Sequence, residues 1–114
     1  MISIIIPVLN EERALPATLQ QVFSQAGEFE VIVIDGGSTD KTIDIVSQDN
    51  RIQFHTAPAG RASQMNAGAE QATGDWLLFL HADTLLPKDA LSSIAQLSPC
   101  LLYTSDAADD VSTV

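Results

Sequence analysis

The stretch WLLFLHADTLLP, from Trp76 to Pro87, decides the fold of this chain. In it an apolar run, Trp76–Leu80, leads directly into His81 and Asp83. Consecutive apolar residues are typical of a strand that is buried on both faces, as in a parallel sheet. Ligands of open α/β sheets bind just beyond the carboxyl ends of such strands, so His81 and Asp83 lie where a binding site is expected. Side chains two residues apart on extended backbone face the same way, and this pair could hold a divalent cation against a phosphate.

The rest of the chain repeats a strand–helix unit. Strands are predicted at Ile2–Val8, Phe29–Asp35, Ile52–Thr56 and Asp75–His81, and helices are predicted between them and again from Pro87. Strands that are separated by helices of about a dozen residues form βαβ crossovers, in which the two strands are parallel. The sequence therefore predicts an α/β fold, a mostly parallel sheet of about four strands with flanking helices.

Two details of the helices can be tested directly. Asn10 is expected to cap the first helix, because asparagine is a favoured residue at that position. The helix over Gly60–Thr73 is rich in small residues. Its expected apolar side consists of Ala62, Met65, Ala69 and Ala72.

Composition excludes several classes of protein. The 114 residues suffice for one small domain, and 15 acidic against 5 basic residues give a formal net charge of −10. This charge argues against binding to nucleic acid. We see neither a signal peptide nor an apolar run near the ~20 residues that span a bilayer, and one cysteine allows no disulfide framework. A cytoplasmic location is expected, and peripheral membrane contact stays open.

Polar clusters follow three of the predicted strands. They are PVLNEE at Pro7–Glu12, DGGSTD at Asp35–Asp40 and HAD at His81–Asp83. The carboxyl ends of parallel strands lie at one edge of the sheet, so the three clusters should converge there.

The order and spacing of these motifs resemble a known family. The matching segments are IIIPVLNEE, VIVIDGGSTDKT and GRASQMNAGAEQATGDWLLFLHADTLLP, and the likeness as a whole extends over almost all of residues 1–99. They resemble the nucleotide-binding half of family 2 glycosyltransferases of the GT-A type. The third segment resembles a bacterial subgroup in which an HAD motif replaces the usual DAD-type metal motif.

The resemblance implies a nucleotide-sugar donor, with a UDP-sugar as the leading candidate, and an acceptor that the sequence does not identify. It implies that Pro7 and Glu12 line the nucleoside pocket and that Asp35 hydrogen-bonds the base. Arg61 and Asn66 would lie near the ribose or the phosphates. A carboxylate such as Asp35 can accept the N–H of a uracil ring, which agrees with this assignment.

The resemblance also implies a divalent metal, Mg²⁺ or Mn²⁺. Asp83 would bind it directly, and His81 stands where the family has its first motif aspartate. Imidazole is an acceptable ligand for Mn²⁺-like ions, but His81 could instead hydrogen-bond the donor. A second departure from the family lies at Asp35–Gly36, where the family often has two adjacent aspartates.

Structural roles fit several of these residues as well. Asp35 and Asp83 could form turns, because Asp-Gly and helix entries favour aspartate, and His81 could simply end a strand. Glu12 could act only on the helix dipole. Arg61 and Asn66 could be solvated side chains.

The residue pattern of the last segment, 100–114, differs from that of the preceding chain. CLLYTSDAADD, within residues 100–114, shows neither strand alternation nor a helical stripe, and it resembles the conceptual translation of a transposase sequencing adapter. We expect residues 1–99 to be the nucleotide-sugar-binding part of a glycosyltransferase domain, and residues 100–114 to be a non-native tail after a frame cut near Pro99. A natural irregular tail is the alternative.

The expected function is therefore metal-dependent transfer of a sugar from a nucleoside diphosphate to an acceptor hydroxyl. The general base of such an enzyme would come from a part that follows the metal motif, and residues 1–99 offer no good substitute. We expect this chain alone to bind nucleotide weakly and to transfer no sugar. The alternatives are a non-catalytic nucleotide-binding module and a nucleotidyltransferase. The second would normally have a glycine-rich basic loop after its first strand, and PVLNEE has none.

Overall fold

Strands and helices alternate along the chain, as the sequence predicts. The computed structural model describes residues 1–95 and 101–104. The elements are β1 (Ile2–Val8), α1 (Leu15–Phe23), β2 (Phe29–Asp35), α2 (Thr42–Ser47), β3 (Ile52–Thr56), α3 (Arg61–Gln71), β4 (Trp76–Leu80), α4 (Ala90–Ala95) and β5 (Leu101–Thr104). All paired strands are parallel, in the order β3-β2-β1-β4-β5. This arrangement confirms the α/β fold.

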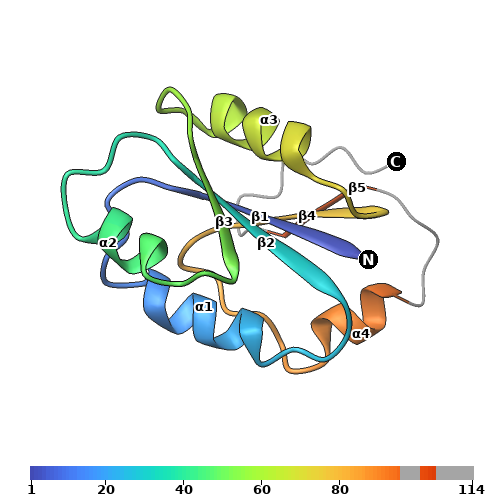
Figure 1. The fold of residues 1–114 in the computed structure, drawn as a ribbon. Coiled ribbons are helices and arrows are strands. Elements are labelled where there is room, and N and C mark those ends of the chain that lie inside the picture. Colours follow the sequence, from blue (N-terminus) through green and yellow to red (C-terminus); the bar gives the residue numbers. More distant parts are fainter. Residues whose placement is uncertain (96–100, 105–114) are drawn as a thin grey trace.

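The sheet, with β1 as its central strand, separates the core into two layers. Helices α1, α2 and α4 cover one face of the sheet, and α3 covers the other (Figure 1). Ile4 and Ile6 point to the first face and Ile5 points to the second, since side chains alternate along a strand. All three are fully buried, which explains why the strand is apolar on both faces, apart from the buried Ser3, rather than alternating.

Helix α3 packs on the sheet through different residues from those expected. Gln64 and Gly68 are its buried residues, whereas Ala62 is exposed. A Cβ atom at Gly68 would lie 2.3 Å from Cγ2 of Ile5, so only glycine permits this approach of helix and strand. The predicted apolar side was therefore wrong at Ala62, although Met65, Ala69 and Ala72 do pack against the buried cluster.

The predicted cap at Asn10 was also wrong. Helix α1 begins at Leu15, and no side chain caps it. Asn10 has a positive φ of 53°, and its Oδ1 accepts a hydrogen bond from the Thr39 backbone N–H at 2.8 Å. Its amide side chain thus joins the loop after β1 to the loop after β2.

A fifth strand adds to the four that were predicted. The backbone of β5 pairs with β4 in parallel, with Leu77 opposite Leu101. The side-chain pattern of this segment did not predict a strand. The unpaired backbone groups on the outer edge of β4 can bind an extended segment of many sequences, which accounts for the difference. Only residues 101–104 of the expected tail at 100–114 are described, so the rest of that expectation lies outside the described residues.

Candidate functional site

The strand order places a crevice beside the central strand. The chain passes from β1 to β2 on one side of β1, and β4 lies on its other side. At such a reversal of strand order the connections leave the sheet in opposite directions, and ligands of α/β proteins bind in the resulting crevice. The carboxyl ends of β1 and β4, together with the first turn of α3, form this crevice here.

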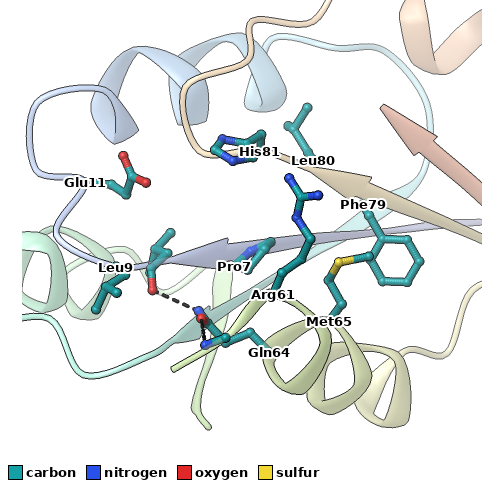
Figure 2. Close-up of a pocket in the computed structure, with 11 residues that line it drawn as sticks. Pro7, Leu9, Glu11, Arg61, Gln64, Met65, Phe79, Leu80 and His81 are labelled. Atoms are coloured by element: carbon teal, nitrogen blue, oxygen red, sulfur yellow. Dashed lines mark hydrogen bonds between the residues drawn. The ribbon is translucent and has the colours of Figure 1, made fainter. Parts of the chain in front are cut away.

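A pocket of about 210 Å³ occupies this position. It is lined by Pro7, Val8, Leu9, Glu11, Gly60, Arg61, Gln64, Met65, Phe79, Leu80 and His81 (Figure 2). Of the predicted site residues, Pro7, Arg61 and His81 are in the lining. Figure 2 shows Arg61 extending from α3 toward the end of β4, where His81 lies.

Asp35 lies at the same sheet edge, but its carboxylate is bound to its own loop. The residue is 1% exposed and stands opposite Val8 in the β1–β2 register. Its carboxylate accepts hydrogen bonds from the backbone N–H groups of Gly37 and Ser38, at 2.8 and 2.9 Å, and from the Ser38 hydroxyl. These contacts match the turn role, and the base-binding role stays a prediction.

Glu12 also has a structural contact. Its Oε1 accepts a hydrogen bond from the Lys41 N–H at 3.1 Å, and its own N–H donates to Asp40 at 3.3 Å. The Glu11 N–H donates to the Thr42 hydroxyl at 2.8 Å. The loops after β1 and β2 are therefore held together, which confirms that the first two polar clusters converge.

His81 and Asp83 form a pair at the end of β4. Nδ1 of His81 lies 2.8 Å from Oδ1 of Asp83, and the two side chains are 37% and 59% exposed. Between them, the Ala82 carbonyl accepts a hydrogen bond from the Thr18 hydroxyl of α1. Thr18 is buried, so α1 anchors the loop that carries both predicted metal ligands.

The predicted metal site has only two protein ligands. Within the described ranges, no group of three or more His, Cys, Asp or Glu side chains is arranged to hold a metal ion. His81 and Asp83 supply one imidazole and one carboxylate. Mg²⁺ and Mn²⁺ commonly complete such a set with substrate phosphates and water, so the pair fits a cation that binds together with a diphosphate.

Negative charge is crowded beside this pair. Burial raises the pKa of the Glu11 carboxyl; His81 opposes this shift, whereas Asp83 and Asp40 add to it. Glu11 lines the pocket, and a raised pKa means that its anionic form is disfavoured there. A bound cation would relieve this crowding.

The sequence prediction omitted Gln64 and included Asn66. Asn66 is exposed on α3 and is not among the residues that line the pocket. Gln64 is 4% exposed and does line it. Its spacing was the available signal, since Gln64 precedes the closely packed Gly68 by four residues and so shares its face of the helix.

The comparisons with known proteins agree with this geometry. The chain is 44% identical over 103 residues to a protein of Mycobacterium bovis named "PGL/p-HBAD biosynthesis glycosyltransferase", covering 83% of this chain and 40% of that protein. It is 38% identical over 98 residues to an uncharacterized glycosyltransferase of Haemophilus influenzae, covering 80% and 39%. The chain thus spans about 40% of the length of these relatives.

Solved structures share the fold. The crystal structure of S. aureus TarS 1-349 in complex with UDP-GlcNAc superimposes with a TM-score of 0.74 at 29% identity, covering 83% of this chain and 30% of that one. The mannosyltransferase PcManGT of Pyrobaculum calidifontis, in complex with GDP-Man and Mn²⁺, gives 0.69 at 26% identity, covering 75% and 28%. The sequence model described as "Glycosyl transferase family 2" matches residues 3–98. This chain belongs to glycosyl transferase family 2.

Proposed function

We propose that this chain is the donor-binding part of a glycosyltransferase that transfers a sugar from a nucleoside diphosphate to an acceptor hydroxyl. One observation carries the proposal: in a chain of this family, the pocket at the reversal of strand order is lined by Pro7, Arg61 and His81. This pocket combines apolar walls with a cationic side chain and a metal-ligating type of residue. Such a combination suits a ring attached to a phosphate.

The size of the pocket agrees with partial binding of the donor. Its 210 Å³ is below the roughly 300–1,000 Å³ that is usual for small-molecule sites. A single ring fits this volume better than a whole nucleotide-sugar. The TarS structure holds UDP-GlcNAc, which supports a UDP-sugar as the donor of this chain.

A divalent cation, Mg²⁺ or Mn²⁺, belongs to the proposal. Asp83 and His81 would hold it, and it would neutralise the negative charge of the donor's diphosphate. The PcManGT structure contains Mn²⁺ beside its donor, which supports this choice. Arg61 would add a second positive charge from α3, and Glu11 would balance the cation from the loop after β1.

The chain alone is expected to bind nucleotide weakly and to transfer no sugar. Transfer of a sugar to an acceptor hydroxyl requires a general base near that hydroxyl. Of the described carboxylates at this edge of the sheet, Asp35 is bound to its own turn, Glu12 to Lys41 and Asp83 to His81. Glu11, which lines the pocket, would balance the cation rather than serve the acceptor. A measurable rate of sugar transfer by this chain would contradict the expectation.

Calorimetric titration with UDP, with and without Mn²⁺, tests the proposal. Mn²⁺ should strengthen UDP binding about tenfold, a typical coupling between two ligands. Asp83→Ala should abolish this enhancement, because it removes the carboxylate ligand. Asp89→Ala, an exposed aspartate in the same segment, is the matched control and should retain it. A UDP affinity that is the same with and without Mn²⁺ would overturn the metal assignment, and so would an enhancement by Mn²⁺ that persists in Asp83→Ala.

A further inference from the structure

Gln64 joins the ends of two strands to the start of α3 through one buried amide. Its Nε2 donates to the carbonyl oxygens of Val8 at 2.9 Å and Ile34 at 2.8 Å, at the ends of β1 and β2. Its Oε1 accepts from the Gly60 N–H at 3.1 Å. Figure 2 shows the side chain reaching from α3 to the end of β1, at the base of the pocket.

These bonds also hold the first turn of α3. The Gln64 backbone N–H donates to the Gly60 carbonyl at 3.0 Å, so Gly60 and Gln64 are linked twice across the turn that contains Arg61. Arg61 follows Gly60 directly and lines the pocket. The Gln64 amide thus links Gly60, the residue before Arg61, to the end of β1.

Gly36 leaves the room that Gln64 needs. A Cβ atom at Gly36 would lie 2.7 Å from Oε1 and 3.0 Å from Cδ of Gln64, and 3.2 Å from Cα of Ala59. Backbone conformation does not explain this glycine, since Gly36 is absent from the described glycines with positive φ. The end of a glutamine side chain could usually move aside. Here it is buried and holds three hydrogen bonds, which would be lost.

We propose that Gln64 is a positioning residue of the nucleotide pocket, that it sets the place of Arg61, and that Gly36 is its required partner. The statement about nucleotide rests on the proposed function, whereas the pairing of Gly36 with Gln64 does not. The pairing gives a physical reason for the glycine at position 36. A side chain at that position and the Gln64 amide compete for the same space.

The first test measures UDP affinity in the presence of Mn²⁺. Gln64→Met keeps the approximate volume of the side chain but removes its hydrogen bonds. It should weaken UDP binding about tenfold, a typical coupling between two sites, because Arg61 is no longer held in place. Gln71→Met makes the same change at an exposed position of α3 and should keep the wild-type affinity. In an Arg61→Ala background, Gln64→Met should have little further effect, because the group that it positions is gone. A purely structural role would lower the urea midpoint without this loss of affinity, and that result would overturn the proposal.

The second test is a double-mutant cycle read by urea denaturation. Gly36→Ala should lower the midpoint clearly in the wild-type background. It should do so much less when combined with Gln64→Ala, because the two closest atoms, Oε1 and Cδ of Gln64, are then absent and only the 3.2 Å approach to Cα of Ala59 remains. Equal shifts in both backgrounds would overturn the pairing. Should Gln64→Met fail to fold, Gly36→Ala displaces the same amide and should weaken UDP binding; wild-type affinity in that variant would then overturn the positioning role.

The two proposals fail in different ways. If the wild-type chain does not bind UDP, the proposed function and the nucleotide role of Gln64 both fall, and the urea cycle still decides the pairing. If the wild-type chain binds UDP and Gln64→Met binds it equally well, only the inference about Gln64 falls.

Discussion

Glu30 and Glu11 are carboxylates at opposite ends of the same sheet, and their surroundings differ. Glu30 is near the start of β2, where it accepts hydrogen bonds from Ser3, Gln53 and Thr73. Burial would raise its pKa, but these hydrogen bonds together lower it. Glu11 follows β1 at the other end, where burial and neighbouring carboxylates raise its pKa despite the opposing effect of His81.

The difference separates a structural edge of the sheet from the edge that carries the proposed binding site. At the amino end of the strands, hydrogen-bond donors are arranged around Glu30, so the charged form stabilises the fold. At the carboxyl end, charged side chains gather around a pocket and the anionic form of Glu11 is disfavoured. Perturbed carboxyl groups in a cleft are typical of functional sites. The following predictions test this contrast.

Glu30→Ala should have the largest effect on stability. It removes a carboxylate that binds the buried Ser3 hydroxyl, and hydrogen bonds to charged groups contribute roughly 1.5–3 kcal/mol. We expect a loss of about 2 kcal/mol in the free energy of unfolding, measured by urea denaturation. Glu28→Ala, an exposed glutamate two residues earlier, should change it by less than about 0.5 kcal/mol. UDP affinity should stay the same in both variants, and its loss in Glu30→Ala would break the contrast.

Acid should remove the same stabilisation. The pKa of Glu30 is lowered from an ordinary value of 4.5, so its contribution is present above that pH and disappears as the pH falls through the folded-state pKa. The difference in unfolding free energy between wild type and Glu30→Ala should therefore be large at neutral pH and small in strong acid. Urea denaturation across this range measures it. A difference that grows as the pH falls would show that the sign is wrong.

Thr18→Val, at the carboxyl end of the sheet, should have an intermediate effect on the free energy of unfolding. It removes the hydroxyl that donates to the Ala82 carbonyl while nearly keeping the side-chain shape. The expected loss is about 1 kcal/mol in unfolding free energy, together with a weaker effect of Mn²⁺ on UDP binding. Thr18→Ser retains the hydroxyl and should restore the Mn²⁺ effect. Wild-type behaviour of Thr18→Val in both measurements would mean that α1 does not anchor this loop.

Glu11→Gln should have the smallest effect on the free energy of unfolding, and it should raise that free energy rather than lower it. The raised pKa of Glu11 means that its ionised form weakens the fold at neutral pH. Neutral glutamine should therefore raise the unfolding free energy slightly, by less than about 0.5 kcal/mol. This gain should vanish as the pH falls through the raised pKa, because the wild-type carboxyl is then protonated. A loss of stability at neutral pH would place Glu11 with the structural carboxylates.

Local patterns in the sequence determined the strands and helices of this molecule and the edge of the sheet at which its polar clusters lie. The apolar runs at Ile2–Val8 and Trp76–Leu80 predicted buried parallel strands, because continuous apolar character requires cover on both faces. The alternation of strands and helices then placed the polar clusters at one edge, which the structure confirms for the loops after β1 and β2. Pro16 lies in the first turn of α1, the part of a helix that tolerates proline.

Other features depended on contacts between distant residues. The sequence did not show that β1 would be central, nor that β5 would pair with β4, since any exposed strand edge offers the same backbone groups. The sequence motifs assigned Asp35 to the nucleotide base and Asp83 to a metal. Only the loop contacts showed that Asp35 is bound by Gly37 and Ser38.

The pocket itself was decided by tertiary structure. Local patterning determined which segments become strands and helices, because hydrophobic periodicity acts over a few residues. The approach of α3 to the sheet instead depends on Gly36 and Gly68, which come from different elements and admit Gln64 and Ile5 respectively. Such fits are set by the volumes of side chains that meet only after folding, so packing, and not local pattern, decided which residues line the site.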